Sequence, residues 1–239
     1  MRVEIIPCLQ DNYSYVIIDE SNSTACVVDP SEASPIISFL KKENIELKYI
    51  LNTHHHFDHI GGNEDLKKEF KSIVLGFKQD SERIPGIEIL LEEGQTWKAE
   101  NFIAKIIHVP GHTSGHICFH FFEDKLVFTG DTLFSLGCGR VFEGTYEEMF
   151  LSLNKIKSLP EETKIYCGHE YTLNNANFCI KHDLDNKNLQ KKIEIIKKQI
   201  KNGQPTIPTT IKDELDCNIF LRAKDLKTFS KLSDLKDNF

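Results

Sequence analysis

Short apolar runs bounded by turn residues dominate the first two-thirds of the chain. They are rich in Val, Ile and Phe, as β-strands are, and they lie at residues 3–7, 13–19, 25–29, 49–53, 72–77, 102–109, 116–122, 125–131 and 163–170. Helical patterns intervene around residues 35–44, 63–70 and 145–160. The last of these opens with a threonine cap and glutamates and stops before a proline. Strands mixed with helices predict an α/β layered domain.

The strand pattern stops near residue 172. One helical stripe follows, made of Leu189, Ile193, Ile196 and Ile200. We therefore expect one domain over residues 1–172 and a small helical domain over residues 173–239. The tail holds 13 basic and 9 acidic residues, a net charge of +4, whereas the rest has a net charge of −11. Two interpretations stay open: a basic tail docked on an acidic domain, or a basic rim that holds an anionic substrate.

Composition narrows the class of protein. The 239 residues are 40% hydrophobic and 27% charged, which fits a globular protein and argues against disorder. No run of about 18 apolar residues exists, so we expect no membrane span. The net charge of −7 disfavours nucleic-acid binding. Seven cysteines without a CxxC pair and no secretory signal predict reduced thiols in a cytoplasmic protein, which we expect to be a monomer.

The strongest chemical signal is the stretch Thr53-His54-His55-His56-Phe57-Asp58-His59, which follows a predicted strand. Four imidazoles this close repel one another once protonated, so a structural role explains them poorly. Residues i and i+2 of an extended chain point the same way, so His54 and His56 can hold one metal ion while His55 faces elsewhere. Asp58 and His59 can serve a second ion.

Three later residues offer further ligands, because each stands at the end of a β-like run: His112, Asp131 and His169. Imidazole and carboxylate ligands suit zinc, iron or manganese better than calcium or magnesium. The sequence therefore predicts a site for two divalent metal ions, with zinc the first choice and iron or manganese the alternatives.

The segments THHHFDH, HVPGHTSGH, TGDTLF and CGHEY resemble the signatures of the metallo-β-lactamase superfamily. This resemblance covers about residues 1–172 and implies an αββα sandwich with a two-metal site. It assigns one metal to His54, His56 and His112, and the other to Asp58, His59 and His169, with Asp131 as the bridge. Thr53, Thr113 and His116 are candidates for supporting these ligands.

The segments GCGRVFEGT (137–145) and GHEYT (168–172), followed by GQPTIPTT and NIFLR, resemble glyoxalase II, the hydroxyacylglutathione hydrolase family. The resemblance spans the whole chain and makes the tail a substrate-binding domain. It implies a glutathione site built from Arg140, Tyr171, Arg222 and Lys224. Phe142 stands where many relatives have tyrosine, and Ile219 stands where proline is common.

The resemblance implies hydrolysis of S-D-lactoylglutathione to glutathione and D-lactate by a hydroxide held on the metals, with Asp58 and Asp131 as the catalytic carboxylates. No cysteine is needed as a nucleophile. The alternatives are an iron-dependent glutathione persulfide dioxygenase of the same fold, a lactonase, β-lactamase or nuclease of that fold, and a metal-binding module without activity. Metal counting and a thioesterase assay discriminate among them.

Overall fold

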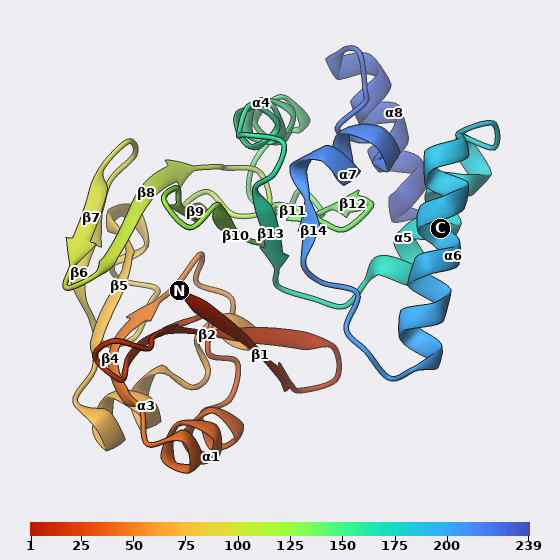
Figure 1. The fold of residues 1–239 in the computed structure, drawn as a ribbon. Helices are drawn as coiled ribbons and strands as arrows, with labels where there is room; N and C mark the ends of the chain where they lie inside the picture. Colours follow the sequence, from red (N-terminus) through yellow and green to blue (C-terminus); the bar gives the residue numbers. More distant parts are fainter. The chain divides into compact units, whose positions relative to one another are not determined.

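The computed structural model describes residues 1–239, and the chain forms two compact units (Figure 1). The first unit comprises Met1–His108 and Gly115–Asp124, and the second comprises Val109–Ser114 and Lys125–Phe239. None of the helices combines the length and the apolar character needed to cross a membrane.

The larger sheet of the first unit has six strands that follow one another in chain order. They are β1 (Arg2–Cys8), β2 (Asn12–Asp19), β3 (Thr24–Val28), β4 (Glu46–Leu51), β5 (Ile73–Phe77) and β6 (Ile87–Leu91). The first two pairings are antiparallel and the next three are parallel. In the parallel part the carboxyl ends of β3, β4 and β5 lie at one edge, where sites usually form in such sheets.

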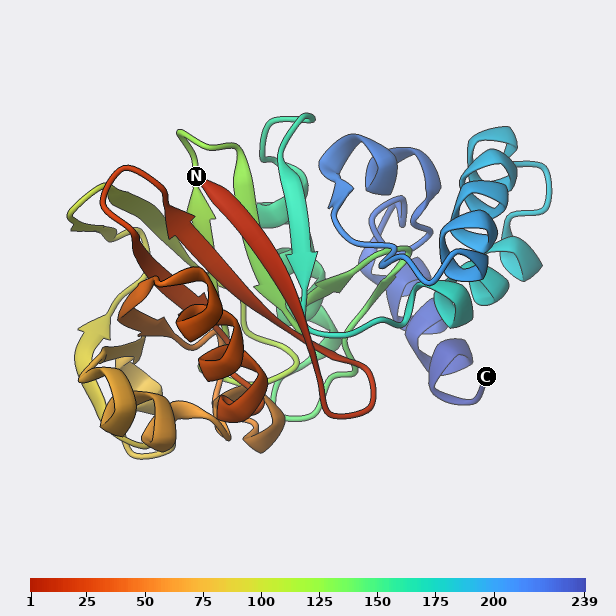
Figure 2. The same cartoon turned by 60° about the horizontal axis from the view of Figure 1, so that its bottom comes forward.

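Two helices, α1 (Ala33–Glu43) and α3 (Asn63–Phe70), lie in two of the three parallel connections, β3 to β4 and β4 to β5, and cover the same face of this sheet (Figures 1 and 2). Apolar side chains from the helices and the strands form one buried cluster that includes Ile36, Leu40, Leu66, Val27 and Ile50. This core fixes the level of the strand ends and therefore of the loops that follow them.

Between β4 and α3 lies the one-turn helix α2 (Phe57–Ile60). The same unit also contains the 3-10 turn η1 (Lys78–Asp80) and an antiparallel ladder of β7 (Thr96–Ala99), β8 (Phe102–His108) and β9 (Ile117–Phe121).

In the second unit β10 (Leu126–Gly130) pairs in parallel with β13 (Lys164–Cys167), and β14 (Thr209–Thr210) extends β13 antiparallel. The strands β11 (Leu133–Phe134) and β12 (Gly137–Cys138) form a small hairpin. The helices are α4 (Tyr146–Lys157), α5 (Thr172–His182), α6 (Lys187–Lys201), α7 (Ile211–Cys217) and α8 (Leu226–Asp237). The teal to blue helices α5 to α8 group together in Figures 1 and 2.

Local chemistry explains where these helices begin. Thr145 and Glu148 form a reciprocal capping box at α4, and the side chains of Asn186 and Asp225 cap α6 and α8.

Every predicted strand run overlaps an observed strand, and the three predicted helices and the α6 stripe are confirmed. The patterns do not predict β6 and β7, because β6 is largely exposed on alternate residues and β7 is only four residues long. The boundary at residue 172 stays a prediction.

Candidate metal centre

The first unit holds four of the seven expected ligands on one short loop. His54 and His56 follow β4, and Asp58 and His59 lie in the single turn of α2. The ring centroid of His54 is 4.7 Å from that of His56 and 4.2 Å from that of His59. His54 and His59 are almost fully buried. Buried imidazoles packed this closely suit ligation by a cation better than protonation.

Asp29, at the carboxyl end of β3, orients two of these histidines. Its Oδ1 accepts the backbone N–H of Thr53 at 2.7 Å. Its Oδ2 accepts the hydroxyl of Thr53 at 2.6 Å and lies 3.1 Å from Nδ1 of His59. Because the Thr53 hydroxyl donates to Asp29, it accepts from Nδ1 of His54, 3.0 Å away. Both histidines therefore carry their proton on Nδ1 and offer Nε2 as the ligand atom.

Asp29 itself is close enough to His54 and His59 for the three to form a metal-sized group, with ligand atoms within 4.8 Å of one another. Its oxygens, however, already accept three hydrogen bonds, so we assign it to support and not to ligation. The sequence pattern predicts Thr53 in that role but not Asp29. The sequence feature that points to Asp29 is the strand run ACVVD, which ends on this carboxylate; the structure shows that it is buried.

Asp58 is held by a second residue that sequence analysis missed. The side-chain amide of Asn12, in β2, donates to Oδ2 of Asp58 at 3.0 Å and to its backbone carbonyl at 3.1 Å. The same Oδ2 lies 3.6 Å from Nε2 of His59. These contacts place Asp58 and His59 as neighbouring ligand candidates. The ring of His116 stacks on His54 at 4.6 Å.

The second unit holds the other three expected ligands. Asp131 follows β10 and His169 follows the parallel neighbour β13, so both stand at the same end of this strand pair. Oδ2 of Asp131 is 3.3 Å from Nε2 of His169 and 3.5 Å from Nε2 of His112. Ligand atoms about 3.4 Å apart are what tetrahedral bonds of about 2.1 Å to one ion require. One carboxylate oxygen thus lies beside two imidazoles, as a bridging ligand would.

The backbone of residues 139–140 holds His112 in place. Nδ1 of His112 donates to the carbonyl of Arg140 at 2.9 Å, which again leaves Nε2 as the ligand atom. The chain passes so closely here that a Cβ at Gly139 would lie 1.9 Å from the Asp131 carbonyl oxygen and 3.2 Å from His112 Nδ1. Only glycine fits at this position.

The residues expected to bind glutathione divide into two groups. Tyr171 stacks on the ligand candidate His169, with centroids 4.6 Å apart. The side chain of Arg140 is 60% exposed, and its Nε lies 3.2 Å from Oδ1 of Asp237. Phe142 is exposed and its ring centroid is 5.1 Å from that of His112. Three of the family-specific positions therefore lie around His112 and His169.

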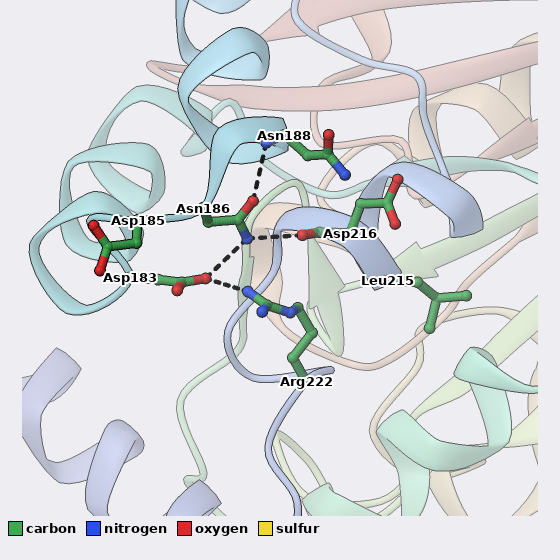
Figure 3. Close-up of a pocket in the computed structure, with 7 residues that line it drawn as sticks. All are labelled: Asp183, Asp185, Asn186, Asn188, Leu215, Asp216 and Arg222. Carbon is green, nitrogen blue, oxygen red and sulfur yellow. Dashed lines mark hydrogen bonds and ion pairs between the residues drawn. The ribbon is translucent and has the colours of Figure 1, made fainter.

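Arg222 and Lys224 lie elsewhere in the tail. Nη1 of Arg222 forms an ion pair with Oδ2 of Asp183 (Figure 3). This pair lines an open pocket of about 430 Å³ together with Asp185, Asn186, Asn188, Leu215 and Asp216. Lys224 is exposed in the segment between α7 and α8.

The cysteines are unsuited to nucleophilic chemistry. No disulfide forms, and six of the seven thiols are buried. Burial raises the pKa of Cys167, Cys179 and Cys217 to about 12, and burial likewise raises the pKa of Cys138, which disfavours the reactive thiolate.

Comparison with known proteins agrees with this chemistry. The sequence profile of the metallo-beta-lactamase superfamily matches residues 9–169, and that of the hydroxyacylglutathione hydrolase C-terminus matches residues 170–239. The hydroxyacylglutathione hydrolase of Pelagibacter ubique (strain HTCC1062) is 61% identical over 239 residues, which are 100% of both chains. The chain belongs to the hydroxyacylglutathione hydrolase family.

Solved structures show the fold of this family member. ETHE1 from Myxococcus xanthus superposes with a TM-score of 0.75 at 22% identity, covering 98% of this chain and 90% of the other. TTHA1623, solved in a di-iron-bound form, has a TM-score of 0.58 at 26% identity and covers 71% and 92%. The fold is the metallo-β-lactamase fold with a C-terminal helical region, as the sequence predicted. Its clustered histidine and aspartate side chains are a site for divalent metal.

Proposed function

We propose that this family member hydrolyses S-2-hydroxyacylglutathione thioesters, with S-D-lactoylglutathione as the substrate and glutathione and D-lactate as the products. The observation that carries the proposal is the 61% identity with the Pelagibacter ubique hydroxyacylglutathione hydrolase over the full length of both chains. The histidines and aspartates oriented by Asp29, Asn12 and Arg140 support it.

We further propose that the two ligand sets share two divalent ions. His54, His56 and His112 would hold one, Asp58, His59 and His169 would hold the other, and Asp131 would bridge them. The fit is chemical: in three of these histidines Nδ1 contacts a protein oxygen and Nε2 remains for a metal. Two such cations would lower the pKa of a water molecule and polarise the thioester carbonyl.

The chain's own residues then have separate tasks. Asp29 and the Arg140 carbonyl hold the imidazoles in the tautomer that can ligate. The Arg140 side chain contacts Asp237 through Nε and Nη2 and is 60% exposed, and we propose that it binds a substrate carboxylate. Tyr171, stacked on His169, lines the same neighbourhood. The leaving thiolate has a reference pKa of about 8.5 and needs no dedicated general acid.

Arg222 and Lys224 are kept in the proposal as glutathione contacts of the tail domain over residues 173–239. Arg222 must exchange its pairing with Asp183 for a substrate carboxylate. We also keep as proposals that the enzyme is a cytoplasmic monomer and that it binds neither nucleic acid nor membranes.

The test is hydrolysis of S-D-lactoylglutathione by protein whose metal content has been measured, followed through thiol release. We expect about two metal equivalents per chain, loss of activity with a chelator and recovery with zinc, iron or manganese. The matched control is the Asp65→Ala variant, which removes an exposed carboxylate of α3. One equivalent of iron with oxygen uptake and no thiol release would instead indicate a persulfide dioxygenase.

A further inference from the structure

His55 stands between two proposed ligands, His54 and His56, and its ring centroid is 5.0 Å from that of His56, but its two nitrogens contact residues outside the ligand set. Its Nδ1 is 3.3 Å from Oδ2 of Asp80, and its Nε2 is 3.3 Å from Nη1 of Arg83. Arg83 closes the triangle, because its Nη2 donates to Oδ1 of Asp80. All three residues lie in the first unit.

The direction of each hydrogen bond follows from the donor inventory. A guanidinium can only donate, so Nε2 of His55 accepts from Arg83. The proton of the neutral ring is then on Nδ1, which donates to Asp80. Both nitrogens of His55 are therefore engaged, and neither offers a lone pair to a metal. His54 carries its proton on the same nitrogen, because its Nδ1 donates to Thr53, but its Nε2 is the atom assigned to the metal.

Burying the carboxylate of Asp80 beside His55 is energetically unfavourable by itself. Its side chain has 0% exposure, and a buried carboxylate is unfavourable unless a cation and hydrogen bonds compensate it. It stands at the end of η1, far in sequence from the ligand loop. Gly115 packs directly on it, since a Cβ there would lie 2.0 Å from Oδ1 of Asp80. The carboxylate is thus fixed between η1, Gly115 and His55.

With three consecutive histidines, a metal ion could bind a different pair from His54 and His56. Neighbouring side chains of an extended segment point to opposite sides, so a metal that captured His55 would have to turn the backbone and displace His54 or His56. We propose that Asp80 and Arg83 are positioning residues that hold His55 away from the metals, so that the loop presents only the pair His54 and His56. The inference rests on the proposed metal centre.

The experiment uses metal-free protein titrated with cobalt(II), whose visible spectrum reports the number and type of its ligands. Wild type is compared with Asp80→Ala, the milder Asp80→Asn, His55→Ala, the double variant Asp80→Ala/His55→Ala and the control Asp65→Ala. Circular dichroism and a thermal melt establish that each variant folds. We expect Asp80→Ala to change the cobalt spectrum and to weaken binding on the order of 10- to 100-fold.

The double variant separates a positioning role from a merely structural one. If Asp80 acts by restraining His55, removing His55 suppresses the defect, and the double variant regains the spectrum and affinity of His55→Ala, which itself stays close to wild type. A double variant as impaired as Asp80→Ala would overturn the proposal, as would an Asp80→Ala variant that binds cobalt like wild type. A wild type that binds no cobalt would overturn the metal centre and this inference together, whereas thioesterase activity is measured independently.

Discussion

The two units position their proposed metal ligands, imidazoles and carboxylates, in different ways. The first unit places His54, His56, Asp58 and His59 within six residues. Two side chains from distant strands support them: Asp29 orients His54 and His59, and Asn12 holds Asp58. The second unit assembles His112, Asp131 and His169 from three separate segments. It positions them through parallel strand ends and a backbone carbonyl. The adjacent ligands of the first unit therefore depend on hydrogen bonds from other side chains for their orientation. The three separate ligands of the second unit depend on the fold to bring them together.

The largest expected effect comes from replacing Asp131, the central residue of the three ligands in the second unit. Asp131→Ala removes the oxygen that lies beside both His112 and His169. We expect loss of metal and a fall in thioesterase activity of more than about a thousandfold, roughly 4 kcal/mol of barrier. Metal analysis and turnover measure this, with Asp65→Ala as the control. A variant with two tightly held metals and near-normal turnover would refute the bridging assignment.

For the ligands of the first unit, the prediction concerns Asp29, which orients His54 and His59. Asp29 has a positive φ of 48°, which asparagine tolerates, so Asp29→Asn preserves the backbone. The amide loses the charge and one of the oxygens that serve Thr53 and His59. We expect metal affinity to fall about 10- to 100-fold, the usual effect of removing a ligand's hydrogen-bond partner. Competition with a chromophoric chelator measures the affinity, and an unchanged value would assign Asp29 to folding alone.

This contrast also explains what sequence analysis could find. The ligand loop is recognisable because its residues are adjacent, and the strand-end ligands are recognisable because each ends a β-like run. Asp29, Asn12 and the triangle of His55, Asp80 and Arg83 were missed, because their roles exist only after distant segments pack together. The pairing of Arg222 with Asp183 was missed for the same reason.

Arg140 and Arg222 allow a finer comparison within the second unit. The side chain of Arg140 is 60% exposed and contacts Asp237 through Nε and Nη2, whereas the less exposed Arg222 pairs with Asp183 through Nη1. We expect Arg140→Ala to raise KM by about 5- to 150-fold, or 1–3 kcal/mol, with kcat nearly unchanged, because a remote carboxylate contact exists in both ground and transition states. Arg222→Ala should act in the same direction and less, because Arg222 must first release Asp183.

A thioester that lacks glutathione is the control substrate for both arginine variants. It should be insensitive to either substitution, and added salt should reduce the advantage of the natural substrate. If Arg140→Ala lowered kcat for both thioesters equally, the side chain would act by keeping the backbone of residue 140 in place beside His112, and not by binding substrate.

The smallest expected effect on turnover comes from Glu214, which supports the hairpin of β11 and β12. Its carboxylate accepts from the backbone N–H of Leu136 and from the side chains of Thr209 and Asn218. Burial raises its pKa to about 7. Since the folded pKa exceeds the unfolded value of about 4.3, the stabilising contribution of the protonated form is complete below about pH 4 and is lost as the pH rises to about 7.

Glu214→Gln keeps the shape and removes the ionisation. The free energy of unfolding of wild type relative to this variant should therefore fall between about pH 4 and pH 8, by up to about 4 kcal/mol. Turnover near pH 7 should stay within about twofold, because Glu214 contacts no proposed ligand. Urea unfolding at several pH values measures the difference. A constant difference between the two proteins across this range would mean that Glu214 titrates normally, and that its hydrogen bonds with Leu136, Thr209 and Asn218 outweigh the penalty of burying its charge.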